Sequence, residues 1–265
     1  DAQESRGLGD VYKRQTFGSY GLRQYDAAVA MNNQKVGVDA YMQSLRSDGY
    51  RDHSGERRDG GGGGVTFRHD NGSIRLYGNT TTQKLDLPGP RLINPTTGEN
   101  QFESDPRGAK NKVDYIKTTT TTFGLQVEQQ LGVGTLYADA STREKKLNGL
   151  SYDGFGDTLR DQKLQENLAS LRYRLPINGG HSVVFGADAQ EAKTTADQNA
   201  YYDFAPSKWQ SRQHQYGLFA EGQIRATDST YVTMGVRRQY ASDKLEVISG
   251  SGEESDKGRH LTAWQ

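Results

Sequence analysis

The feature that most constrains the fold is an alternation of apolar and polar residues with a period of two, which recurs along almost the whole chain. Leu136, Ala138 and Ala140, for example, alternate with Asp139 and Ser141. A period of two places successive side chains on opposite faces of an extended strand. The pattern predicts about 11 strands, many of them about twice the usual length of five or six residues.

The connections between these predicted strands alternate between short turns and long polar loops. Short turns are expected near 32–34, 70–73, 130–133, 176–180 and 226–229, where asparagine and glycine suit tight hairpins. Long loops are expected near 48–59, 86–112, 146–161, 196–212 and 243–258. An antiparallel up-and-down sheet with one trimmed rim and one elaborated rim produces this order, as transmembrane β-barrels do.

The polar faces of the predicted strands carry charges that a dry protein core would not accept. Arg172, Arg174, Asp188, Glu221 and Arg237 all occupy such positions. In a soluble β-sandwich the apolar faces pack against a second sheet. In a membrane barrel they face lipid, and the charged faces line a wet interior. The sequence therefore favours an all-β, transmembrane up-and-down barrel.

Composition and motifs argue against catalysis. The chain of 265 residues has no cysteine and a formal net charge of zero, which gives no support to a thiolate site or to nucleic-acid binding. Its five histidines are dispersed, no nucleophile-elbow motif is present, and the glycine run Gly60–Gly64 lacks a phosphate-loop signature. We expect that run to ease the chain from a loop into a strand. We expect no enzyme, catalytic residue, cofactor or metal site, and interpret Asp153, Asp157 and Asp161 as part of a solvated loop rather than a calcium site.

The candidate binding residues lie in two of the predicted long loops. Arginine forks with aromatic neighbours suit anionic ligands. The candidates are Tyr50, Arg51, His53, Arg57 and Arg58 in the loop 48–59, with Arg91 and Arg107 in the loop 86–112. The alternative is an ordinary solvated loop, because nearby acidic residues offset the arginines.

Several segments, taken in order, resemble the barrel of TonB-dependent outer-membrane receptors. They are FGSYGLR at 17–23, DGYRD at 48–52, LPGP at 87–90, FGAD at 185–188 and VTMGVR at 232–237. The resemblance implies a barrel of about 22 strands, closed by an N-terminal plug, in the outer membrane of a Gram-negative bacterium. It also implies active uptake of a ferric siderophore or similar iron chelate, driven through a TonB box.

The chain is expected to be an internal piece of such a receptor. No plug or TonB box is visible in it, and about 11 strands are half of the expected number. Residues 16–265 are interpreted as a partial barrel, and residues 1–15, which include GLGDVYKRQ, as an adapter-like non-native segment. A half-barrel with open edges should neither transport nor insert stably by itself.

Two other function classes share part of this pattern. A passive porin-type barrel would share the alternation and the loops but not the ordered motifs. A secreted β-sandwich or lectin-like binding module would need a second sheet over the apolar faces.

Overall fold

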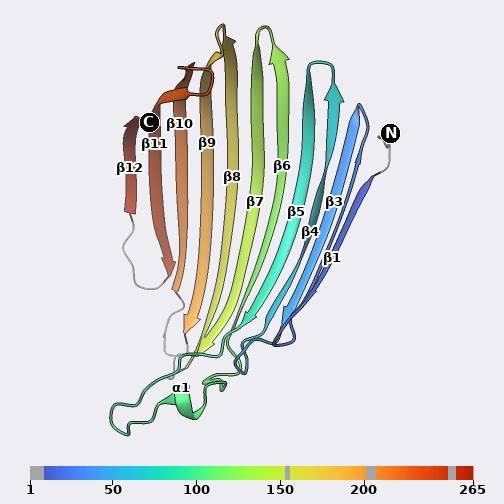
Figure 1. The fold of residues 1–265 in the computed structure, drawn as a ribbon. Coiled ribbons are helices and arrows are strands. Elements are labelled where there is room, and N and C mark those ends of the chain that lie inside the picture. The colour runs from blue at the N-terminus through green and yellow to red at the C-terminus, as the bar shows by residue number, and fades with distance from the viewer. Residues whose placement is uncertain (1–8, 153–155, 201–206, 250–254, 265) are drawn as a thin grey trace.

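The computed structural model describes residues 9–152, 156–200, 207–249 and 255–264, and these residues form one curved sheet (Figure 1). Its 12 strands are all antiparallel, and each strand pairs with its neighbours in chain order. The strands are β1 (Asp10–Phe17), β2 (Arg23–Asn32), β3 (Val36–Ser47), β4 (Glu56–His69), β5 (Gly72–Asp86), β6 (Tyr115–Leu131), β7 (Gly134–Tyr152), β8 (Asp157–Ile177), β9 (His181–Ala200), β10 (Ser207–Arg225), β11 (Tyr231–Ser249) and β12 (Ser255–Trp264). The single described helix, α1 (Gln101–Ser104), lies in the loop between β5 and β6. The predicted all-β, antiparallel up-and-down architecture is confirmed.

One end of the sheet carries tight turns and the other carries the longer connections (Figure 1). The predicted short turns are confirmed, and their local chemistry explains them. In the β2–β3 turn, Asn33 Oδ1 accepts hydrogen bonds from the backbone N–H groups of Lys35 and Val36, at 2.8 and 2.7 Å. Gly132 and Gly179 adopt φ values of 60° and 85° in two other turns, where a side chain would be strained.

The strands on the loop side run further than the sequence pattern predicts. Much of 146–161, 196–212 and 243–258 belongs to strands rather than loops, and Gly60–Gly64 lies inside β4 rather than at its start. Backbone ladder bonds continue regardless of polarity, and the charged side chains there stabilise one another. Glu144 accepts from Lys146 Nζ at 2.9 Å and from Lys163 Nζ at 2.8 Å.

The strand count also differs from the expected 11, because residues 10–17 form β1. This segment overlaps residues 1–15, which the sequence predicts to be non-native. It pairs along its whole length with β2, for example Lys13 opposite Ala27. An edge strand needs one ladder of backbone hydrogen bonds and no apolar face, so side-chain patterning gave no signal for it.

The two faces of the sheet differ as the alternation predicts. Cross-strand register places Val38, Val65, Leu76 and Leu125 in one row of the apolar face, which we call the outer face. Among the described residues the buried apolar side chains are two alanines, and large outer residues such as Leu218 remain up to 66% exposed. The described strands form a single sheet, so the second sheet that a β-sandwich requires is not found. In the described part of the chain, no helix combines the length and apolar character needed to cross a membrane.

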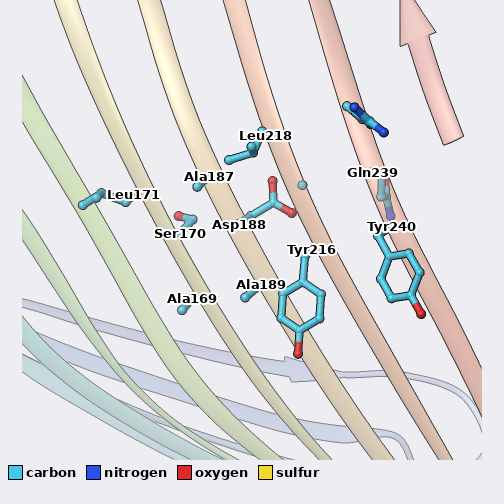
Figure 2. A pocket seen from close by; sticks show the side chains of 12 residues that line it. Ala169, Ser170, Leu171, Ala187, Asp188, Ala189, Tyr216, Leu218, Gln239 and Tyr240 are labelled. Carbon is cyan, nitrogen blue, oxygen red and sulfur yellow. The ribbon is translucent and has the colours of Figure 1, made fainter. Parts of the chain in front are cut away.

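The outer face is hollowed where small residues lie between large ones. Ala169, Ala187 and Ala189 lie beside Leu218 and Tyr216 around a groove of about 710 Å³ (Figure 2). Tyr216 lies directly opposite Tyr240 at the loop-side edge of this apolar region. Paired tyrosines at the edge of an apolar band are typical of a membrane interface.

Candidate ligand-binding site

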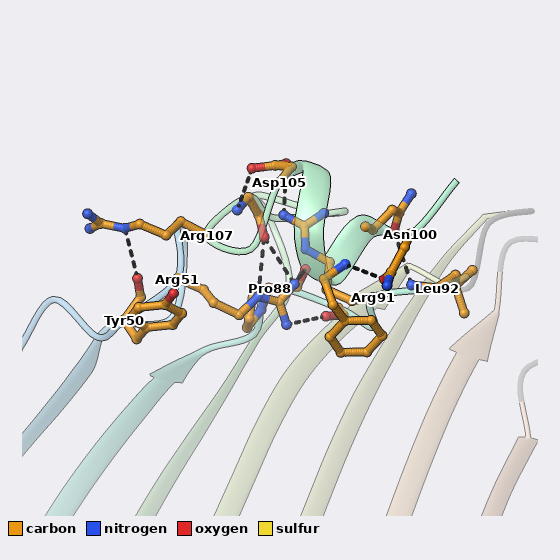
Figure 3. Close-up of polar contacts among 12 residues, drawn as sticks. Tyr50, Arg51, Pro88, Arg91, Leu92, Asn100, Asp105 and Arg107 are labelled. Carbon is orange, nitrogen blue, oxygen red and sulfur yellow. Dashed lines mark hydrogen bonds and ion pairs between the residues drawn. The ribbon is translucent and has the colours of Figure 1, made fainter. Parts of the chain in front are cut away.

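Two loops at the same end of the sheet dock against each other, and Arg51 holds them together (Figure 3). The loop 48–55 joins β3 to β4, and the loop 87–114 joins β5 to β6. Arg51 Nη1 donates to the carbonyl oxygen of Gly89 at 2.8 Å, and its Nη2 and Nε donate to that of Gly108 at 3.0 and 3.2 Å. Arg51 Nη2 also donates a longer hydrogen bond, of 3.4 Å, to the carbonyl oxygen of Pro88. The Arg51 guanidinium is therefore engaged with backbone carbonyls.

Tyr50 and Arg107 form a second contact between these loops. Arg107 Nε donates to the carbonyl oxygen of Tyr50 at 3.2 Å, and its guanidinium carbon lies 5.9 Å from the centre of the Tyr50 ring. Tyr20, from the β1–β2 connection, meets the same ring edge-on at 5.5 Å. Tyr50 thus joins three successive loop-side connections, and its side chain remains 49% exposed. The Arg107 guanidinium can pair with an anionic group of a ligand, and the exposed Tyr50 ring offers that ligand apolar contact area.

His53 connects the first loop to a buried carboxyl group. It adopts a left-handed backbone conformation, with φ of 52°, and its Nε2 lies 2.7 Å from the carbonyl oxygen of Asp114. Asp114 Oδ1 accepts from Asn111 Nδ2 at 2.7 Å and from the backbone N–H of Tyr152 at 2.8 Å. Burial raises the pKa of the Asp114 carboxyl, and the Tyr152 hydrogen bond and His53 partly offset that effect.

Arg91 is buried beside the short helix. Its side chain is only 7% exposed, and its Nη2 pairs with Asp105 Oδ2 at 2.9 Å. The buried Nε of Arg91 has no hydrogen-bond partner among the described residues. Asn100 caps α1 by accepting from the backbone N–H of Phe102, which fixes the turn that brings Asp105 close (Figure 3).

The two remaining candidates lie on β4 and point in opposite directions. Arg58 is on the inner face, where its Nη2 pairs with Glu56 Oε1 at 2.7 Å. Glu56 also accepts from Gln83 at 2.8 Å. Arg57 is on the outer face and is exposed. The structure therefore brings Tyr50, Arg51, His53, Arg91 and Arg107 into one loop junction and separates Arg57 from them.

The inner face carries charged pairs that the sequence analysis did not assign to a site. Arg237 donates from Nη1 and Nη2 to both carboxylate oxygens of Asp188, at 2.8 and 2.7 Å. The pair spans β9 to β11 across Gly217, which lies opposite Asp188 on β10. A Cβ at Gly217 would lie 2.5 Å from Arg237 Nη2. The glycine therefore lets the arginine lie flat against the sheet.

The same arrangement recurs near the other edge of the sheet. Arg75 on β5 reaches across Gly64 on β4 to the carboxylate of Asp39 on β3, at 2.7 and 3.1 Å. Between these two pairs, Arg172 binds Asp139 at 2.8 Å. The alternation identified the inward residues, but these pairings depend on cross-strand register and could not be predicted from one strand.

No group of three or more histidine or acidic side chains suited to a metal ion occurs in the part of the chain that the structure describes. Asp153 of the calcium candidate lies outside the described residues. Asp161 accepts a hydrogen bond from Asn148. The described site is therefore an assembly of arginines, tyrosines and backbone carbonyls at the loop end, above a charged inner face.

Comparison with known proteins matches residues 43–262 to the family model described as TonB dependent receptor-like, beta-barrel. No curated protein matches the chain in sequence. The fold is similar to the unliganded ferric citrate transporter FecA (TM-score 0.77, 14% identity, 97% of this chain and 40% of that one). It is also similar to the copper transporter OprC (TM-score 0.76, 14% identity, 98% of this chain and 43% of that one). A third similar structure is the ferric yersiniabactin uptake receptor FyuA from Yersinia pestis (TM-score 0.73, 11% identity, 99% of this chain and 44% of that one). The chain spans less than half the length of each of these structures.

Proposed function

The chain belongs to the TonB-dependent receptor β-barrel family, and on that premise we propose that it forms part of an outer-membrane receptor for active uptake of a ferric siderophore or similar iron chelate. The observation that carries the proposal is the family match over residues 43–262. These residues form most of a sheet whose outer face is apolar and whose inner face is charged. Two of the similar structures named above are iron-chelate transporters by description. The third is described as a copper transporter, so a copper complex is the competing cargo.

In this proposal residues 16–265 supply barrel wall, and residues 1–15 are non-native although residues 10–15 extend the sheet as part of β1. The outer face contacts the lipid of a Gram-negative outer membrane. TonB would engage a TonB box and plug that lie outside residues 1–265. No cofactor or nucleic acid takes part.

The contacts suggest distinct roles for the candidate residues. Tyr50 combines an exposed ring with an adjacent guanidinium, so we assign it to ligand contact together with Arg107. Arg51 and His53 act as positioning residues, because their polar atoms bind loop carbonyls. Arg91 and Arg58 carry charge next to the site but are already paired with carboxylates.

The experiment is uptake of radioactive metal by cells that express the complete receptor. Ferric citrate, a ferric catecholate and a copper(II) salt serve as separate probes, with and without a functional TonB. TonB-dependent accumulation of iron is the expected result. If copper alone accumulates, the cargo is a copper complex rather than an iron chelate. Uptake that does not require TonB would indicate a passive channel and contradict the proposal.

A further inference from the structure

Arg91 is a buried arginine whose hydrogen-bonding capacity is only partly used. Its side chain is 7% exposed, and its Nη2 pairs with Asp105 Oδ2 at 2.9 Å. The buried Nε has no hydrogen-bond partner in the part of the chain that the structure describes. A buried donor without a partner destabilises the fold, so such a group in a native protein calls for an explanation, such as a role in binding.

The empty Nε and the occupied Nη2 of Arg91 lie on the same edge of the guanidinium plane. Their N–H bonds point in parallel, at a spacing that matches the two oxygens of one carboxylate. Asp105 contributes a single oxygen to this edge. Its other oxygen, Oδ1, accepts instead from the backbone N–H of Gly108 at 3.0 Å. The Nε–Nη2 edge therefore has the geometry for a bidentate carboxylate but binds a monodentate one.

The backbone around Gly108 keeps Asp105 in this half-bound position. The N–H of Gly108 also lies 3.3 Å from the carbonyl oxygen of Asp105, and Arg51 Nη2 binds the Gly108 carbonyl oxygen at 3.0 Å. A Cβ at Gly108 would overlap both Asp105 Oδ2 and Arg91 Nη2, so the pair requires glycine here. With Oδ1 bound to Gly108, Asp105 leaves the Nε of Arg91 without a partner.

Asp105 is bound weakly enough for another anion to displace it. Its side chain is 61% exposed, in contrast to that of Arg91. An ion pair to a carboxylate that solvent reaches contributes little stability, because water and salt screen it. A carboxylate that places both of its oxygens on Nε and Nη2 makes the stronger, bidentate pair. Such a carboxylate, brought by a ligand, would replace Asp105 on Arg91.

Arg91 lies in the same loop junction as the residues assigned to ligand contact (Figure 3). Arg107 follows Asp105 by two residues, and its Nε binds the carbonyl oxygen of Tyr50 at 3.2 Å. The two Nη groups of Arg107 make no hydrogen bond or ion pair within the described ranges. Arg51, in contrast, uses Nε and both Nη groups on loop carbonyls. Arg91 and Arg107 are thus the arginines of this junction that keep donors for a ligand.

We propose that the Nε–Nη2 edge of Arg91 is a subsite for a free carboxylate of the transported chelate, and that Asp105 occupies this subsite until the ligand arrives. The inference rests on the proposed function and narrows the cargo to chelates that keep a carboxylate not bound to the metal. On exchange, Asp105 turns to solvent while its Oδ1 can keep the N–H of Gly108. An uncharged hydroxamate chelate has no carboxylate and gains nothing from Arg91.

The test is a double-mutant cycle on the complete purified receptor in detergent, with affinities measured by titration calorimetry at about 0.15 M salt. The probe is tricarballylate, a tricarboxylate that carries no metal. Asp105→Asn removes the internal carboxylate and should tighten binding about fivefold, which is the value of one solvent-exposed ion pair. Arg91→Gln removes the edge and should weaken binding about tenfold or more. In the double variant the gain from Asp105→Asn should vanish, because that gain acts through Arg91.

Asp52→Asn is the matched control, because Asp52 is an exposed acid of the same junction whose carboxylate pairs with no described residue. It should change the affinity for tricarballylate by less than about twofold, since salt screens its charge. Ferric citrate should follow the pattern of tricarballylate across the cycle. An uncharged ferric trihydroxamate should bind equally to every variant.

The proposal is overturned if Asp105→Asn binds tricarballylate no more tightly than the unmodified receptor does, which is the result that a purely structural ion pair predicts. It is also overturned if the gain persists in the Arg91→Gln background. Inorganic phosphate that competes as well as tricarballylate would overturn the assignment to carboxylates. TonB-dependent iron uptake is a separate readout: the expected binding pattern without uptake would contradict the proposed function and leave the subsite standing.

Discussion

Replacing Arg51 by methionine should release the loop 87–114 from the loop 48–55. Methionine keeps most of the aliphatic length but removes every donor. Three of the hydrogen bonds that Arg51 makes to Gly89 and Gly108 are 3.2 Å or shorter. At about 1 kcal/mol for each bond at this partly buried position, the docked arrangement should lose about 3 kcal/mol. That loss corresponds to about a hundredfold change in the docking equilibrium.

Hydrogen–deuterium exchange of the complete receptor measures this change directly. The reporters are the backbone N–H of Asp52, which donates to the carbonyl oxygen of Arg107 at 2.6 Å, and that of Lys110, which donates to Pro88 at 2.8 Å. Both should exchange about a hundredfold faster in Arg51→Met. Lys112→Met provides the control, because Lys112 is an exposed residue of the same loop. Unchanged exchange of both reporters in Arg51→Met would refute the assignment of Arg51 as the residue that docks the loops.

Three further predictions concern the two faces and the buried carboxyl. Ala138→Arg on the outer face should lower the free energy of unfolding by about 2–4 kcal/mol, measured by a folding titration into lipid vesicles. Ser141→Arg on the inner face should lower it much less. Equal losses for the two variants would contradict the face assignment. Burial raises the pKa of Asp114, so loop docking should be strongest below the carboxyl's ordinary value of 3.8 and should weaken as pH rises through the raised value. Asp114→Asn should abolish the pH dependence of the protection factors, which are the intrinsic exchange rates divided by the observed ones, and a persisting dependence of these factors would assign it to another group. Gly217→Val should displace Arg237 and lower the free energy of unfolding by about 1–3 kcal/mol, which lowers the melting temperature. Gly222→Ala is the control and should leave the melting temperature unchanged, because a Cβ there meets nothing within 4 Å. Similar melting temperatures for both variants would show that Gly217 is not needed for the pairing of Arg237 with Asp188.

The alternation of side chains was sufficient to predict the class of fold and the tight turns. A period of two is a local property, and residues such as Asn33 and Gly179 fix turns through their own backbone preferences. The strand ends were less predictable. Polar segments such as 146–152 continue as strands, because ladder hydrogen bonds and pairs such as Glu144 with Lys163 stabilise them without apolar contacts.

The candidate site was predictable as a location but not as a set of contacts. The arginine content of the loops 48–59 and 86–112 indicated anion binding, yet Arg51 binds carbonyl oxygens of a segment almost 40 residues away. The separation of Arg57 from Arg58 follows from the extension of β4 to Glu56. The pairs Asp188 with Arg237 and Asp39 with Arg75 each span three strands, so they depend on a register that no single strand encodes.

We infer that the apolar face of this sheet contacts lipid while the charged face contacts water. Spin labels placed one at a time along β9 of the complete receptor in lipid vesicles test it most directly. Labels at Val183, Phe185 and Ala187 should collide mainly with oxygen, and labels at Ser182, Val184 and Gly186 mainly with a water-soluble nickel chelate. The oxygen and nickel accessibilities should each vary with a period of two residues, and the two profiles should be out of phase with each other. Equal access of the nickel chelate to both sets of positions would contradict it.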